Sequence, residues 1–332
     1  MVNIEETTMT CFNRIILELK RVWQDSPPLT AVTVLMIGVF AASVAGIALD
    51  PRTITGVPAW LKPAKFAIST AIFCGTMAWL FRYINIWPKF VRAMGWILAA
   101  VLVLEVAIID IQAARGTTSH FNVGTVLDGV LFSVMGSSIA ILWLASIGVL
   151  LALFRQRFED TAWGWWLRMG MLITVLGSAA GGLMVRPTST QLEKLQSHQP
   201  VSVVGAHTVG APDGGPGVSG LGWSTEHGDL RIPHFFGLHG IQILPFVGWL
   251  MLRRRRYAID GRDASIAAAA GIGYIGFVAI LTWQALRGIS IVSLDGLTMT
   301  ALVIWTAVSA GIFFLLPGNP DHAKDAFTRS TI

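Results

Sequence analysis

The sequence predicts an all-α integral membrane protein, and three observations carry this prediction. First, 54% of its 332 residues are hydrophobic and only 13% are charged, too few to cover the surface of a soluble protein of this length. Second, runs of about 20 almost uncharged residues recur, which is the helix length that crosses about 30 Å of hydrocarbon. Third, several short motifs occur twice in the same order, which indicates an internal duplication.

We expect eight transmembrane helices, each a run of apolar residues between polar or helix-ending residues. They cover residues 29–49, 66–85, 91–113, 127–154, 163–185, 233–252, 264–286 and 297–316. An amphipathic segment at 10–23 is expected to lie on the inner membrane surface before the first helix. We expect no cleavable signal peptide.

Basic residues predict that both termini are cytoplasmic, because Lys and Arg accumulate in the inner loops of membrane proteins. With the N-terminus inside, the inner segments carry 16 of the 24 Lys and Arg residues, including the Arg253–Arg256 run, and the outer segments carry 8. The net charge of +5 follows mostly from this asymmetry, so we do not interpret it as a sign of nucleic-acid binding.

The stretch EVAIIDIQAARG at 105–116 recurs as FVAILTWQALRG at 277–288, with seven identities in twelve positions. Leu-Asp-Gly follows each copy, at 127–129 and at 294–296. The shared order of these motifs favours a duplication over chance.

We therefore expect two tandem four-helix repeats, 1–158 and 159–332, the second containing a long Gly-rich outer loop at 186–232. Because four spans are an even number, both repeats insert the same way up, as in transporters built from parallel repeats. The polar residues kept in both repeats are Gln112 and Gln284, Arg115 and Arg287, and Asp128 and Asp295. Each Asp can cap the helix that it precedes, and each Arg ends the helix before it, so a structural Arg–Asp clamp is expected at this loop.

Two acids occur in the first repeat only, where Glu105 and Asp110 take the places of Phe277 and Thr282. Glu105 is expected roughly 15 Å below Arg115, near the bilayer midplane. An ionised carboxylate there costs at least about 2.5–3.5 kcal/mol, so it is protonated, paired or exposed to water. Both acids are candidate catalytic groups; the alternative is a buried acid bonded to a neighbouring side chain.

Three histidines are candidate metal ligands or catalytic groups. His120 lies in an insertion of the first repeat, and His234 and His239 lie at the start of the sixth span. Gly237 and Gly240 beside His239 permit close approach of another helix, a porphyrin or a substrate, so His234 and His239 are candidates for binding haem or a divalent metal. The alternative is that both are hydrogen-bonded packing residues.

The Gly-rich stretch at 204–229 is expected to fold over the outer mouth as a lid, or to be a flexible connection. Lys65, at the start of the second span, is a candidate counter-charge for Asp110. The candidate substrate and lid residues are Lys65, Gln112, His207, Asp213, Trp223 and Arg231.

Four phrases resemble an uncharacterised family of bacterial multi-pass membrane proteins. They are KPAKFAIS (62–69), ARGTTSHFN (114–122), GAHTVGAPDGGPG (205–217) and DLRIPHFFGLHGIQ (229–242). The resemblance implies a bacterial inner membrane and transfers no activity. All four phrases map to the expected outer half of the protein.

Three functions are compatible with these residues. The first is a membrane-embedded, haem- or metal-dependent redox enzyme that acts on a lipid-soluble or extracytoplasmic small molecule. The second is a proton- or ion-coupled carrier in which Glu105 titrates. The third is a sensor or assembly factor without chemistry. The residue types favour the enzyme slightly, since redox and metal sites use histidines and acids.

Overall fold

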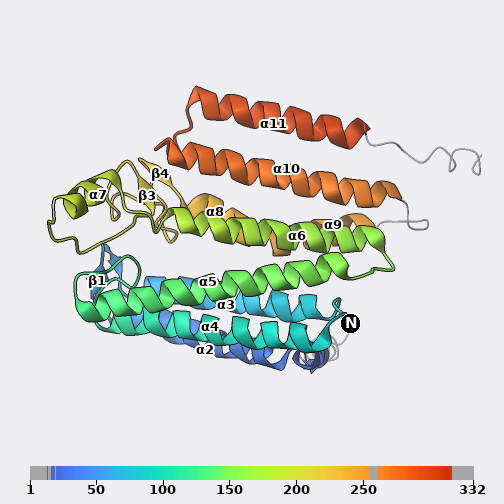
Figure 1. The fold of residues 1–332 in the computed structure, drawn as a ribbon, viewed down its shortest axis with the longest axis horizontal. Coiled ribbons are helices and arrows are strands. Elements are labelled where there is room, and N and C mark those ends of the chain that lie inside the picture. Colours follow the sequence, from blue (N-terminus) through green and yellow to red (C-terminus); the bar gives the residue numbers. More distant parts are fainter. Residues whose placement is uncertain (1–12, 14–15, 19, 254–260, 316–332) are drawn as a thin grey trace, which may run out of the picture. The chain divides into compact units, whose positions relative to one another are not determined.

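The computed structural model describes residues 13, 16–18, 20–253 and 261–315, which fold mostly into helices (Figure 1). The long helices are α2 (Pro27–Leu49), α3 (Leu61–Phe81), α4 (Pro88–Ala114), α5 (Val126–Arg155), α6 (Thr161–Ala180), α10 (Gly261–Leu286) and α11 (Gly296–Leu315). The short ones are η1 (Gly181–Leu183), α7 (Ser189–Gln196), α8 (Arg231–Leu238) and α9 (Gly240–Leu252). Two antiparallel strand pairs join β1 (Thr53–Ile54) to β2 (Val57–Pro58) and β3 (Thr208–Val209) to β4 (Gly228–Asp229).

Seven helices among the described residues are long and apolar enough to cross a membrane, and α8 with α9 makes an eighth span if the bent pair is counted as one. The seven are the long helices named above, with α6 continuing through η1 to Leu183. The prediction of a multi-pass helical membrane protein is confirmed at this level.

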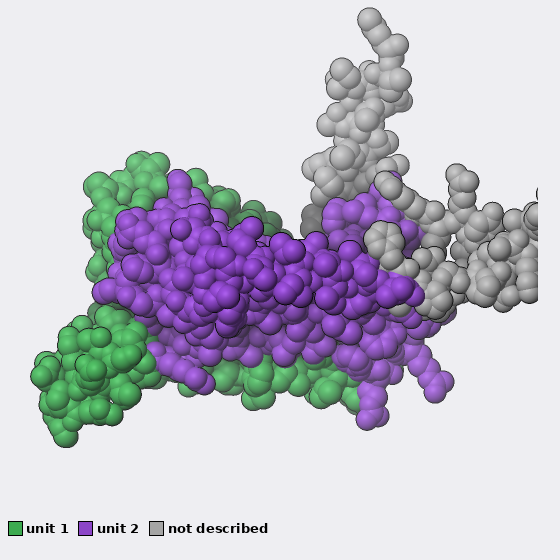
Figure 2. Space-filling model, turned by 90° about the horizontal axis from the view of Figure 1, so that it is seen from above, with its two compact units in different colours: residues 1–152, 187–205 green, residues 153–186, 206–332 purple. Residues whose placement is uncertain are grey.

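The chain divides into two compact units, which Figure 2 colours separately. Unit 1 comprises residues 1–152 and 187–205, and unit 2 comprises 153–186 and 206–332. Unit 1 therefore contains α2 to α4 and α5 as far as Ala152, and unit 2 contains the end of α5, α6, the bent pair α8–α9, α10 and α11. The first part of the long connection predicted at 186–232, including α7, belongs to unit 1.

In unit 1, α3 packs against α2 and α4, and α2 also contacts α4. The turn between α2 and α3 is fixed by two contacts of Trp60. Its ring lies against Gly46, where an added Cβ would be 2.6 Å from Trp60 Cγ, and its Nε1 donates to Asp50 at 2.8 Å. Fully buried core side chains of this unit include Leu29, Met36, Met77, Leu80 and Leu98.

In unit 2, α6 packs on α8, α9 and α10, and α10 contacts α11. One buried core cluster consists of Trp166, Met169, Ile173, Leu244, Ile266 and Ala267. At the other end of α6, Gly177 meets Gly237 of α8 backbone to backbone: a Cβ at Gly177 would lie 2.4 Å from the Cα of Gly237. Small residues thus let these two helices touch, as is common in membrane proteins.

The sixth span differs from the prediction of one continuous helix over 233–252. It breaks at His239, and α8 and α9 are bent by 46° at this point. Gly237 and Gly240 flank the break, where α6 approaches most closely. A helical hydropathy pattern does not register such a break, because both segments remain apolar.

Side chains from neighbouring helices satisfy the backbone groups that the break frees. The hydroxyl of Thr174 in α6 accepts a hydrogen bond from Ile241 N–H at 3.0 Å. Its single hydrogen lies within reach of two carbonyls, Gly170 O at 3.0 Å and Leu238 O at 3.2 Å. Tyr274 of α10 donates to the carbonyl of Phe236 at 2.9 Å. Hydrocarbon offers no hydrogen bonds, so such side chains are required for a broken helix to persist in a membrane.

Some predictions fall outside the described residues. These are the ones made for residues 10–12, 14, 15 and 19 of the amphipathic segment, for Arg254–Arg256 and for the two ends of the chain. The cytoplasmic placement of both termini therefore stays a prediction.

Candidate functional site

The loop between α4 and α5 folds back among the helices of unit 1. Phe121 and Asn122 are 4% and 7% exposed, and Phe121 has a positive φ of 64°, an uncommon conformation for a residue with a Cβ. The amide of Asn122 donates to Thr117 Oγ1 and Thr118 O at 3.0 and 3.1 Å. Segment 201–205 of the same unit binds this loop through two backbone hydrogen bonds: Val123 N donates to Ser202 O, and Val204 N donates to Phe121 O.

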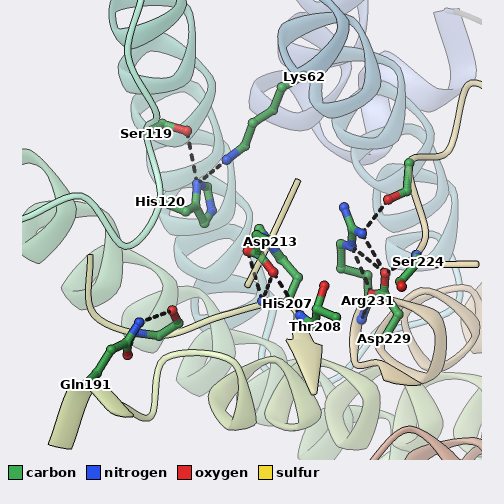
Figure 3. Close-up of polar contacts among 12 residues, drawn as sticks. Lys62, Ser119, His120, Gln191, His207, Thr208, Asp213, Ser224, Asp229 and Arg231 are labelled. Carbon is green, nitrogen blue, oxygen red and sulfur yellow. Dashed lines mark hydrogen bonds and ion pairs between the residues drawn. The ribbon is translucent and has the colours of Figure 1, made fainter. Parts of the chain in front are cut away.

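This inward turn places His120 beside Glu105 (Figure 3 shows the other partners of His120). His120 Nε2 lies 3.5 Å from Glu105 Oε1. On the opposite side of the ring, Lys62 Nζ and Ser119 Oγ lie 3.0 and 3.1 Å from His120 Nδ1. Phe66 packs against the imidazole with 5.5 Å between ring centroids. The four polar residues, which we call the Glu105–His120 cluster, come from α3, α4 and the loop.

The partners fix the tautomer of His120. An ammonium group only donates, so Nδ1 accepts from Lys62 Nζ, and the neutral ring carries its hydrogen on Nε2. Nε2 lies 3.5 Å from Glu105 Oε1, so the ring stands between a cation and a carboxylate. The cluster can therefore hold one negative and one positive charge with a neutral imidazole between them.

Glu105 and Asp110 each retain one buried carboxylate oxygen without a hydrogen-bond partner among the described residues, Oε2 and Oδ1 respectively. Glu105 is 3% exposed, and Asp110 is half-buried. A buried acid oxygen without a partner is costly, which is the usual signature of a group that binds a proton or a ligand.

The residues predicted as a clamp in unit 1 lie in contact. Arg115 Nη1 is 2.7 Å from Asp128 Oδ1, and Gln112 Nε2 donates to the same oxygen at 2.9 Å. The prediction that Asp128 caps α5 is wrong. Thr125 occupies that position, accepting from the Asp128 backbone N–H at 3.2 Å, while Asp128 lies in the first helical turn.

In unit 2 the equivalent contact joins Arg287 to Asp295. Asp295 does cap its helix, since Oδ1 accepts from Thr298 N at 3.0 Å. Gln284, unlike Gln112, has a buried amide oxygen without a partner among the described residues. The two clamps share their residues and differ in how the following helix begins.

The two histidines of the sixth span have different surroundings. His234 Nδ1 lies 2.7 Å from the carbonyl of Gly177, which only accepts, so this ring donates and ties α8 to α6. His239 stands at the break, with Nδ1 3.2 Å from Gln242 Oε1 and its ring 4.4 Å from that of Phe235. His234 is thus a packing residue, whereas His239 keeps Nε2 without a partner among the described residues.

The neighbouring glycines do not provide room for a haem. A Cβ at Gly237 would lie 2.4 Å from Gly177, and one at Gly240 would lie 2.6 Å from the side chain of Ile173. These glycines admit α6, so a porphyrin does not fit beside Gly237 and Gly240, where the sequence analysis expected it.

A metal site at the three histidines also gains no support from the geometry. The described part of the chain contains no group of three or more His, Cys, Asp or Glu side chains that could hold a metal ion. His120 belongs to unit 1, and His234 and His239 belong to unit 2. The predicted metal site stays a prediction.

Two carboxylates of unit 2, Asp213 and Asp229, hold the segment predicted as a lid through hydrogen bonds and ion pairs (Figure 3). Asp213 accepts from His207 Nδ1 at 2.6 Å and from the backbone N–H of Thr208 at 2.9 Å. Asp229, fully buried, pairs with Arg231, predicted here as a substrate residue.

Lys65, the other predicted substrate cation, is half-buried on α3. Trp223 packs edge-on against Phe235, with 5.4 Å between ring centroids.

Acidification is expected to loosen the turn around Asp213. Burial alone would raise the pKa of Asp213, but hydrogen bonds and charge from His207, with backbone N–H groups, hold that pKa well below its usual value of 3.8. Such a carboxylate stabilises the folded state above its unfolded pKa, about 4, and the stabilisation is lost as pH falls below it. Hydrogen exchange in 204–229, corrected for intrinsic rates, should stay constant from about pH 7 to 5 and rise below about pH 4.

Asp213→Asn should abolish this pH dependence. Glu226→Gln, which changes an exposed glutamate of the same segment, should keep it. An acid response that survives in Asp213→Asn would assign it to another group.

The sequence analysis did not list Lys62, Ser119, Thr174 or Tyr274 among the candidate site residues. Lys62 and Ser119 lie within the phrases KPAKFAIS and ARGTTSHFN, so those phrases contained the signal. Thr174 and Tyr274 had no such signal, because their role depends on a helix break.

Comparisons with protein families, with curated proteins and with solved structures give no match for this chain. The resemblance carried by the four phrases therefore stays a prediction.

Proposed function

We propose that this protein is a proton-coupled membrane carrier and that Glu105 is its proton-binding group. One observation carries the proposal: Glu105, buried within α4, lies 3.5 Å from His120, which in turn contacts Lys62 and Ser119. Intramembrane acids are expensive to maintain and, in series with histidines, serve as proton relays in pumps and transporters.

The two nitrogens of His120 provide the route for the proton. A proton that arrives at Nδ1, from the side of Lys62 and Ser119, converts the ring to imidazolium. Nε2 then releases its own proton to Glu105 Oε1, and the ring returns to neutrality. Glu105 then releases that proton toward the other side of the membrane, and the imidazole resets by returning its hydrogen from Nδ1 to Nε2. Because Oε2 of Glu105 has no partner among the described residues, a polar group of a substrate can compete for the acid there.

The broken span supports a carrier over a static scaffold. Carriers commonly use discontinuous helices within the membrane, where a break permits a local change of backbone conformation. Here the break at His239 rests on the hydroxyls of Thr174 and Tyr274, hydrogen bonds that can exchange during a conformational change.

The placement in the membrane is part of the proposal. We infer two four-helix repeats inserted the same way up, with both termini cytoplasmic, in a bacterial inner membrane. Four spans in each unit and an Arg–Asp contact at equivalent positions support the repeat. With this orientation, Lys62 and His120 lie toward the outer face, and the transported molecule is extracytoplasmic or lipid-soluble.

Proton flux into liposomes tests the proposal, with the proton itself as the probe. Purified protein is reconstituted with a pH-sensitive dye inside, and a potassium diffusion potential drives protons inward. We expect Glu105→Gln to reduce the flux to that of protein-free liposomes. His120→Ala should slow it by about tenfold or more, as loss of a general acid–base group does.

Two controls separate a relay from a structural role. Asp110→Asn makes the same type of change at the other acid of α4 with a buried oxygen that lacks a partner among the described residues. It should retain most of the flux, because no histidine of the described part of the chain contacts Asp110. Added imidazole should partly restore His120→Ala, which a purely structural histidine would not allow. Wild-type flux no greater than that of protein-free liposomes, or an undiminished Glu105→Gln, would refute the proposal.

A membrane-embedded redox enzyme is the second candidate, and one observation favours it. His239 Nε2 has no hydrogen-bond partner among the described residues, so an imidazole nitrogen is available for acid–base chemistry beside the aromatic ring of Phe235. Because α6 fills the space beside Gly237 and Gly240 where a haem was expected, the substrate of such an enzyme would itself have to be redox-active.

A further inference from the structure

We propose that unit 2 carries a binding site for the head group of a quinone or quinol at His239, Phe235 and Trp223. The site lies where the sixth span breaks, and it uses neither Glu105 nor His120. It therefore stands or falls separately from the proton relay.

The three side chains form a continuous aromatic row. The ring of Phe235 lies 4.4 Å from that of His239 and 5.4 Å from that of Trp223, centroid to centroid. Phe235 is 41% exposed and belongs to the bent helix pair α8–α9, which is apolar enough to cross a membrane. A planar ring can therefore stack on the exposed part of Phe235, because aromatic rings favour offset or edge contacts at these distances.

The polar part of the site is one imidazole nitrogen. His239 Nδ1 is engaged by Gln242 at 3.2 Å, and its Nε2 has no partner in the described part of the chain. Ligand sites are typically apolar with few polar groups that fix orientation, and this row with one accessible nitrogen has that composition.

The chemistry of His239 and Gln242 selects the ligand. In one tautomer, Nδ1 donates to the amide oxygen of Gln242, and Nε2 can accept a hydrogen bond from a hydroxyl. If the amide is turned, its NH₂ group donates to Nδ1, and Nε2 can then donate to a carbonyl. One site can thus hold both the quinol and the quinone forms of the same head group. The surrounding membrane supplies lipid-soluble molecules, and among these a planar ring with such oxygens matches all three side chains.

Binding of decylubiquinone to the full chain in nanodiscs tests this site. Bound quinone is extracted after affinity capture and quantified, with empty nanodiscs subtracted. We expect saturable binding by the wild type and an affinity at least tenfold lower for His239→Phe, which keeps a ring and removes Nε2. Phe235→Leu should also weaken binding. Decane, which has the chain without the head group, should not compete.

Phe246→Leu is the matched control, because Phe246 is also an exposed phenylalanine of the bent span, on α9 and outside the row. It should bind as the wild type does. Thermal unfolding of each variant establishes that it is folded. Absence of saturable wild-type binding, unchanged affinity in both His239→Phe and Phe235→Leu, or an equal loss in Phe246→Leu would overturn the proposal.

Discussion

Gly177→Ala is expected to destabilise unit 2 by about 3 kcal/mol, the upper end of the usual cost of overpacking. The added Cβ would lie 2.4 Å from both the Cα and the carbonyl carbon of Gly237. Both atoms belong to backbone, so no side chain can rotate away, and α6 must separate from α8. The hydrogen bond from His234 to the Gly177 carbonyl would be disturbed at the same time.

Thermal unfolding in detergent measures this effect, and Gly311→Ala is its control. Gly311 lies within α11 of the same unit, and a Cβ there would have no neighbour within 4 Å among the described atoms. Alanine at that position should leave stability unchanged or raise it by about 0.5–1 kcal/mol through helix propensity. If the two variants unfold alike, α6 and α8 do not make the contact described.

The spans of this protein were predictable because hydropathy and helix length are properties of a single segment. The break at His239 was not, since it depends on how Thr174 of α6 and Tyr274 of α10 meet the freed backbone. A hydropathy pattern contains no record of those contacts. For the same reason, Gly237 and Gly240 could be recognised as positions of close approach, but what approaches them could not be identified.

The Glu105–His120 cluster was half predictable. The second repeat has no counterpart of Glu105 or of the insertion that contains His120. This difference identified both residues as candidates. Their pairing depends on the left-handed Phe121 and on hydrogen bonds from segment 201–205, about 80 residues further along the chain. Without that inward turn, a loop histidine is expected in water rather than beside an acid of α4.

Arg231 shows a contact that the sequence analysis did not anticipate. It pairs with Asp229, two residues earlier, and its predicted contact with a substrate stays a prediction. The neighbouring acid was visible in the sequence. What could not be foreseen is the complete burial of that acid, which follows from the packing of β4.

Asp229→Asn is expected to cost about 3 kcal/mol, the lower end for breaking a buried ion pair, because the Arg231 side chain is still 29% exposed. Asp229 accepts from Arg231 Nε at 2.9 Å and from Ser224 N at 2.8 Å. An amide at this position lacks the charge and turns an NH₂ group toward at least one of these donors. Thermal unfolding and proteolysis of 204–229 should both show the loss.

Two further variants identify the cause. Asp50→Asn changes a similar Asp-x-Arg pair in unit 1, where Arg52 is 49% exposed and water screens the pair. We expect a smaller loss, which comes mainly from the hydrogen bond that Trp60 Nε1 donates to Asp50. Adding Arg231→Met to Asp229→Asn removes the unpaired charge and should restore part of the lost stability. If the double variant is as unstable as the sum of the single ones, the loss comes from the backbone contact with Ser224 and not from the ion pair.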